Sequence, residues 1–165
     1  MLNFLKILTV VVVAVEMALA LAHALELPGK MRLTKDAYFA VQRIYYPGFT
    51  IGGMSEPAGF IATLVLLFLT ATGSVAFWLT LVALTGLVGM QIVYWIFIHP
   101  VNKVWMQGET LSSAGSGFFG LGRSQIQSRG RDPEWTELRN RWEYGHVARA
   151  ALAAMSFIAL VIAIS

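Results

Sequence analysis

Glutamate and histidine side chains recur three residues apart near the ends of apolar segments. Glu143 and His146 form one such pair, and His23 and Glu26 form a second pair in the reverse order. This spacing places both members of a pair on one face of a helix. Imidazole with carboxylate suits iron, copper, manganese or zinc, and the same groups can transfer protons. The pattern therefore predicts a metal site, with all four residues as ligands, or a proton-transfer site.

The three histidines of the chain all fall near an end of an apolar segment. His23 closes the first segment, His99 ends the third and His146 opens the fourth. Asn102 follows His99 by three residues. Polar groups inside a membrane usually face the protein interior and mark functional sites. We therefore expect these side chains at one membrane level.

The same residues also admit a structural interpretation. Glu143 could pair with Arg139 or Arg149, which lie on the same helical face. His23 and His99 could make ordinary hydrogen bonds at the membrane interface. Because Glu-x-x-His spacings arise by chance in helices, the spacing alone leaves both interpretations open.

A further carboxyl group, Glu16, interrupts the first apolar segment two turns before His23. An ionised carboxylate near the middle of a bilayer costs at least roughly 2.5–3.5 kcal/mol. Glu16 should therefore face the bundle interior, be protonated, or pair with a cation. Together with Glu56 and His23 it could instead form a proton relay.

The elements that must position these residues are membrane-spanning helices. The 165 residues are 57% hydrophobic and 13% charged, with a mean hydropathy of +0.66. Soluble domains carry about 25% charged residues, and a spanning helix needs roughly 20 apolar ones. We expect an all-α, four-transmembrane-helix bundle that forms a single domain over residues 1–165. The four apolar segments are 2–25, 58–73, 75–98 and 144–165.

Breaker residues and caps predict the connections. Pro28 with Gly29 is expected to end the first helix near residue 25, and His99 with Pro100 to end the third. Thr34 is a suitable N-cap for a short amphipathic helix in the first long loop, through residue 43. A glycine-rich loop then leads to Asp132, the expected cap of the last helix.

Charge indicates orientation and excludes several classes of protein. All but Lys6 of the twelve lysines and arginines lie on the side of the two long loops. By the positive-inside rule that side is cytoplasmic and both termini are not, as in a multi-pass protein of a bacterial inner membrane. The absence of cysteine excludes disulfides and thiol redox chemistry. The net charge of +3 is too small to indicate a nucleic-acid partner.

Two stretches resemble a known family. Residues 99–102 read H-P-V-N, and residues 135–149 read W-x-x-L-R-x-R-W-E-x-x-H-V-x-R. Together with residues 28–46 they resemble the anthrone oxygenase-like (DUF1772) family of small four-helix membrane proteins. The resemblance implies a four-helix bundle and, for members in polyketide pathways, oxygenation of an anthrone to an anthraquinone. It also implies shared site residues, namely Asn102, Arg139, Trp142, Glu143 and His146.

These observations combine into one leading hypothesis, a membrane oxygenase or oxidoreductase for a hydrophobic, aromatic substrate that arrives from the bilayer. His146 and His23 would act as bases or metal ligands, with Glu143 and Glu26 as ligands or proton acceptors. Arg139 and Asn102 would orient an anionic oxygen. Trp142 and His99 would contact a cofactor, which could be iron or copper, unless the reaction needs none.

Two other classes of function fit the same sequence. A non-catalytic small subunit of a larger membrane complex could use the polar cluster as a structural network. A proton-coupled small transporter could use Glu16, Glu56 and His23 as its relay. The expected partners are the lipid bilayer and a hydrophobic small molecule, with either a homo-oligomer or a larger complex as the assembly.

Overall fold

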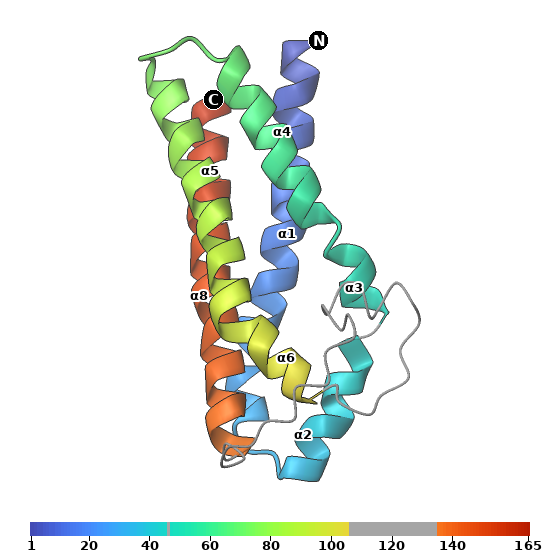
Figure 1. Ribbon diagram of the computed structural model, residues 1–165. Helices are drawn as coiled ribbons and strands as arrows, with labels where there is room; N and C mark the ends of the chain where they lie inside the picture. The colour runs from blue at the N-terminus through green and yellow to red at the C-terminus, as the bar shows by residue number, and fades with distance from the viewer. Residues whose placement is uncertain (46, 106–134) are drawn as a thin grey trace.

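The computed structural model describes residues 1–45, 47–105 and 135–165, and in this part of the chain four helical spans are long and apolar enough to cross a membrane (Figure 1). The first is α1 (Leu2–Lys30), and the second (Gly48–Leu69) consists of the short α3 (Gly48–Gly52) and α4 (Ser55–Leu69). The third consists of α5 (Val75–Val93), the π-helical η2 (Tyr94–Ile98) and α6 (His99–Trp105). The fourth is α8 (Trp135–Ile164). The predicted all-α bundle of four transmembrane helices is confirmed.

The four spans close into a ring, because α8 packs against α1 and α5 while α4 packs against the same two helices. Both termini and the α4–α5 turn lie at one end of the bundle, and α2 (Lys35–Gln42) and α6 lie at the other (Figure 1). Gly73 gives this turn its positive φ of 81°, and the Ser74 Oγ accepts a hydrogen bond of 3.1 Å from the Phe77 N–H. Gly73 and Ser74 therefore make this connection a tight turn.

The predicted amphipathic helix in the first long loop is α2. The Thr34 Oγ1 caps it by accepting a hydrogen bond of 3.4 Å from the Ala37 N–H. Tyr38 is its fully buried residue, whereas Ile44 falls in the 3-10 turn η1 (Arg43–Tyr45) that follows and is exposed. The burial of Tyr38 therefore docks α2 on the bundle.

Two expected helix ends are wrong, because the helices continue through their prolines. Helix α1 passes Pro28 and ends at Lys30, and the third span passes Pro100. Pro100 has no N–H to offer the Ile96 carbonyl, which lies four residues earlier. The Arg141 guanidinium donates to that carbonyl instead, and the π-helical turn before Pro100 accommodates the missing bond.

Small residues let α5 and α8 approach closely near the middle of the bundle. A Cβ on Gly86 would lie 2.2 Å from the Ser156 Oγ, and that hydroxyl donates a hydrogen bond of 2.9 Å to the Ala83 carbonyl. Contacts of this kind are typical of helix packing in membranes. The glycine-rich segment 112–122 and the expected cap at Asp132 lie outside the described residues.

Candidate active site

The imidazoles of His23 and His146 face each other between α1 and α8. Their ring centroids are 4.2 Å apart, and the ring planes are inclined at 40°. Both side chains are buried. The helices run in opposite directions (Figure 1), so the end of α1 meets the start of α8 at this level. The structure thus brings together the two histidines that the sequence placed at one membrane level.

Aromatic rings surround this histidine pair. The Trp142 ring lies 4.1 Å from His146 and 5.2 Å from His23, while Tyr45 and Phe49 lie 4.6 and 4.5 Å from His23. Within the described part of the chain, the His23 Nδ1 and both nitrogens of His146 have no hydrogen-bond partner. The hydrogen-bonding capacity of these nitrogen atoms is therefore not used within the described structure.

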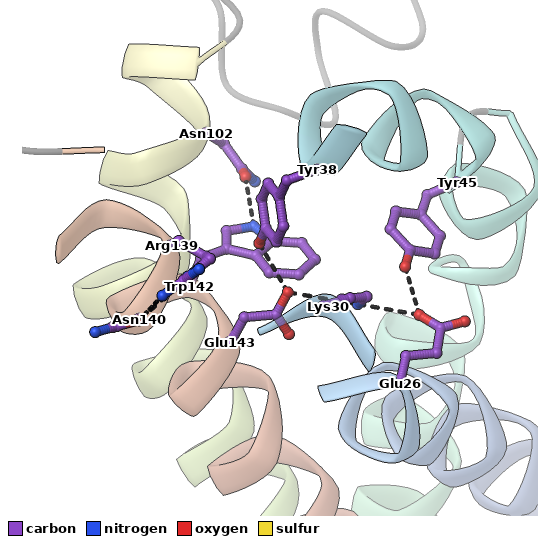
Figure 2. Close-up of polar contacts among 9 residues, drawn as sticks. All are labelled: Glu26, Lys30, Tyr38, Tyr45, Asn102, Arg139, Asn140, Trp142 and Glu143. Carbon is purple, nitrogen blue, oxygen red and sulfur yellow. Dashed lines mark hydrogen bonds and ion pairs between the residues drawn. The ribbon is translucent and has the colours of Figure 1, made fainter. Parts of the chain in front are cut away.

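Asn102 fixes the orientation of the Trp142 ring. Its Oδ1 accepts a hydrogen bond of 2.9 Å from the indole Nε1–H, and both side chains are buried (Figure 2). Asn102 comes from α6, so this bond joins the end of the third span to α8. The residue expected to orient an oxygen of the substrate thus contacts the tryptophan beside His146.

The carboxylates of the predicted metal site contact a lysine rather than the histidines. The Lys30 Nζ lies 3.0 Å from the Glu26 Oε2 and 3.6 Å from the Glu143 Oε1 (Figure 2). The hydroxyl of Tyr38 donates a hydrogen bond of 2.7 Å to Glu143, and that of Tyr45 donates to Glu26. Among the described residues, no group of three His, Asp or Glu side chains is placed to hold one metal ion. The four predicted ligands thus divide into a histidine pair and two lysine-bound carboxylates.

Burial keeps the two tyrosine donors protonated. It raises the pKa of Tyr38 far above its usual value, and the neighbouring Glu143 charge adds to the rise. Burial and the hydrogen bond to Glu26 raise the pKa of Tyr45 in the same way. Each hydroxyl is therefore a stable donor to its carboxylate across the physiological pH range.

His99 and Arg139, two of the predicted site residues, lie apart from the histidine pair. His99 packs its ring 4.6 Å from that of Trp95. Its position follows the π-helical turn, which changes the direction of later side chains relative to an uninterrupted α-helix. The Arg139 guanidinium lies over the Trp135 ring at 4.9 Å and donates to the Asn140 Oδ1 at 3.2 Å. Neither residue is among those that line the cavity described next.

A cavity of about 1350 Å³ opens beside the histidine pair. Its wall is mostly apolar and comes from all four spans and from the segment around η1 and α3. His23, His146 and Trp142 line one part of it. A second polar group lines it deeper in the bundle and consists of Glu16, Glu56, Gln91 and Arg149.

The deeper group is organised around Glu56 at the start of α4. The Arg149 guanidinium donates to one of its oxygens, and the Gln91 Nε2 donates to the other at 2.6 Å. The Glu16 Oε2, in contrast, has no partner within the described residues. The polar side chains of α1, α4, α5 and α8 thus meet inside the bundle.

The sequence analysis did not predict that Lys30 and Tyr38 contact the site carboxylates. For Lys30, the sequence does contain a pattern that indicates such a contact. Glu26 and Lys30 have the i,i+4 spacing of an intrahelical ion pair. This pairing requires that the helix continue past Pro28, whereas the rule that proline ends a helix predicts that it stops there. Tyr38 carried no comparable signal, since its contact with Glu143 joins residues 105 positions apart.

Comparison with known protein families identifies the family of this chain. The family model described as anthrone oxygenase matches residues 43–159. The matched range contains Asn102, Trp142 and His146, whereas His23 and Lys30 precede it. Searches of curated proteins and of solved structures give no match.

Proposed function

Since the chain belongs to the anthrone oxygenase family, we propose that it is a membrane-embedded oxygenase that converts an anthrone-like aromatic substrate into the corresponding quinone. The observation that carries this proposal is the pair formed by His23 and His146 on the wall of a large apolar cavity. A pocket of 300–1,000 Å³ is typical for a drug-sized ligand. The volume of about 1350 Å³ is therefore sufficient for a substrate with several fused rings.

The substrate enters this cavity from the bilayer. Met54, Ile61 and Trp95 line the cavity and are also among the exposed large hydrophobic residues of the bundle. Exposed apolar side chains on a transmembrane bundle face lipid, so the cavity reaches the lipid-facing surface. Trp142 and Phe49 offer ring faces and edges for offset stacking with an aromatic substrate.

The histidine pair supplies the base. A neutral imidazole carries one nitrogen with a free lone pair. His146 takes a proton from the methylene carbon of the anthrone, whose anion is delocalised onto the ring carbonyl. His23 lies close enough to help hold or release that proton.

Molecular oxygen completes the reaction. The carbanion is oxidised by O₂, and a new C–O bond forms a hydroperoxide at the former methylene carbon. Loss of the second C–H proton and cleavage of the O–O bond then give the second ketone and release water. One oxygen atom enters the product and the other leaves in water, so the substrate supplies all four electrons. No external reductant is required, and no step passes through a metal.

Anthraquinone formation by the purified protein tests this function. We expect the protein in lipid nanodiscs to consume one O₂ per anthraquinone formed, above the rate in empty nanodiscs. His146→Gln should lower kcat by about a hundredfold or more, as expected for loss of a general base. His99→Gln is the matched control, because His99 is a buried histidine outside the cavity lining. Equal rates with and without wild-type protein would refute the proposed activity.

We also infer the orientation of the protein in the membrane. The end that carries α2 and α6 holds Arg32, Lys35, Arg43 and Lys103, whereas the other end holds Lys6. The positive-inside rule assigns the first end to the cytoplasm of a bacterial cell. The histidine pair then lies toward the cytoplasmic side of the bilayer.

A further inference from the structure

Glu16 is a buried carboxyl group that the chemistry above does not use. It lies near the middle of α1, and its side chain is only 2% exposed. Its Oε2 has no hydrogen-bond partner in the described part of the chain, although the residue lines the cavity. Burying a polar group without a partner is costly, and more so inside a membrane. Such an atom is therefore a candidate for contact with a ligand.

The neighbouring helix leaves room for this carboxyl group. Gly59 of α4 faces it so closely that an added Cβ would lie 2.8 Å from the Glu16 Oε2. Any larger side chain at position 59 would have to displace the carboxyl. Gly59 thus permits Glu16 to occupy its place beside the cavity.

Arg149 offers a second unsatisfied atom nearby. Its side chain is 6% exposed and lines the same cavity, and its Nε has no partner among the described residues. Another nitrogen of the same guanidinium donates to Glu56. Glu16 is close enough to interact electrostatically with both Arg149 and Glu56. The single positive charge of Arg149 is therefore already paired with the Glu56 carboxylate and is not available to balance Glu16.

We propose that Glu16 and Arg149 form a second subsite of the cavity, which binds a neutral hydroxyl group at the far edge of an aromatic ligand. A hydroxyl can donate to the Glu16 carboxyl and accept from the Arg149 Nε–H at the same time. A carboxylate there would face two carboxyl groups and one already paired guanidinium. The charge balance therefore favours a neutral phenol or alcohol over an anion.

The distance from the histidine pair fits this arrangement. Glu16 precedes His23 by seven residues, which places it on the same helical face about 10 Å away along the axis of α1. A fused aromatic skeleton that presents its reactive carbon to the histidines can thus extend a ring substituent to Glu16. The subsite rests on the proposed function and adds to it a preference for hydroxylated over carboxylated substrates.

Equilibrium binding of three anthraquinones tests the subsite without turnover. One probe is unsubstituted, one carries a hydroxyl on the outer edge of a terminal ring, and one carries a carboxyl there. Quenching of tryptophan fluorescence reports binding, since Trp142 lines the cavity. The wild-type protein should bind the hydroxylated probe about tenfold more tightly than the unsubstituted one, as expected for one added hydrogen bond to a charged group.

Substitutions at Glu16 separate the hydrogen bond from the charge. Glu16→Leu should remove the preference for the hydroxylated probe over the unsubstituted one. Glu16→Gln should keep the preference for the hydroxylated probe, because the amide oxygen can still accept the hydrogen bond from the hydroxyl. Thr63→Val is the matched control, since Thr63 is a fully buried polar residue that does not line the cavity.

The outcomes distinguish the subsite from the proposed activity. If wild type binds the hydroxylated and unsubstituted probes equally, or if Glu16→Leu keeps the wild-type preference, the subsite is refuted while anthrone oxidation can still be measured. If the preference depends on Glu16 but the protein forms no anthraquinone, the subsite stands and the proposed function is refuted.

Discussion

The Lys30 ammonium group lies 3.6 Å from the Glu143 carboxylate, and the two side chains are only 3% and 0% exposed. This ion pair joins the last turn of α1 to the third turn of α8. His23 lies seven residues before Lys30, and His146 lies three residues after Glu143. The ammonium group also lies over the rings of Tyr45 and Trp142, at 4.9 and 5.1 Å from their centroids. The pair therefore fixes the two helix ends that carry the histidines.

Replacing Lys30 with methionine should destabilise the protein strongly. The substitution leaves the Glu143 carboxylate buried, with the Tyr38 hydroxyl as its remaining partner among the contacts drawn in Figure 2. Removing one member of a buried ion pair costs about 3–5 kcal/mol. Thermal unfolding in detergent measures the effect, and Lys35→Met, at an exposed position, is the control. The double variant Lys30→Met/Glu143→Leu should recover much of the loss. A stable Lys30→Met single variant would show that Glu143 is not charged in the folded protein.

Replacing Tyr38 with phenylalanine should reveal a stability difference that depends on pH. The pKa of Tyr38 is raised by burial and by Glu143, so the folded state holds the phenolic proton more tightly than the unfolded state does. The stability that this provides is fully present below the unfolded pKa of about 10 and is lost as pH rises above it. The free energy of unfolding of the wild-type protein should therefore exceed that of Tyr38→Phe by about 1–2 kcal/mol at neutral pH.

The difference between wild type and Tyr38→Phe should shrink above about pH 10. Unfolding midpoints measured from neutral to alkaline pH provide the test. Tyr144→Phe is the control, because Tyr144 is exposed. A difference that grows with alkalinity would contradict the burial of the Tyr38 hydroxyl against Glu143.

The main features of the fold could be predicted from hydropathy and turn residues. Four apolar segments, the Gly73–Ser74 turn and the Thr34 cap each have a local cause, and the structure contains all of them. The approach of His23 to His146 was also predictable, since antiparallel spans bring residues at one membrane level together. Membership in the anthrone oxygenase family agrees with the motif read at residues 135–149.

The contacts of the candidate site depend on features that sequence patterns do not carry. The rule that proline ends a helix places Lys30 outside the first helix. In the structure α1 continues past Pro28 and includes Lys30. Lys30 forms ion pairs with Glu26 and Glu143, the two carboxylates that the spacing suggests as metal ligands. A regular α-helical pattern likewise does not predict the π-helical turn before His99. This turn changes the direction of the His99 side chain, which lies apart from the histidine pair.

The Arg141 side chain should compensate for the missing N–H of Pro100. Arg141→Met removes the donor to the Ile96 carbonyl and should lower the free energy of unfolding by about 1 kcal/mol. Pro100→Ala restores a backbone N–H four residues after Ile96, so the same Arg141 substitution should cost less in that background. A double-mutant cycle in thermal unfolding measures this coupling. Lys103→Met, at an exposed position on the same span, is the control. Equal costs in both backgrounds would mean that Arg141 does not act through this carbonyl.

A reporter fused after Ser165 should lie outside the cytoplasm. The C-terminus shares one end of the bundle with the N-terminus and the α4–α5 turn (Figure 1), and this end is poor in lysine and arginine. A periplasmic phosphatase fusion should be active, and a fluorescent protein that matures only in the cytoplasm should stay dark. Insertion of the same reporters at Gly73 should give the same result. Fluorescence from both fusions would reverse the inferred orientation.

Asn102 should act on the proposed reaction through Trp142 and not directly on the substrate. Its Oδ1 accepts the indole N–H at 2.9 Å, and the Trp142 ring lies 4.1 Å from His146. Asn102→Leu should therefore misplace the indole and lower kcat about tenfold, as expected for loss of one positioning hydrogen bond. Trp142→Phe keeps a ring beside His146 but removes the same hydrogen bond. If Asn102 acts through Trp142, the double variant should be no slower than the slower single variant, because residues that act as a unit are not additive. Independent, multiplicative losses in kcat would instead assign Asn102 a contact with the substrate oxygen.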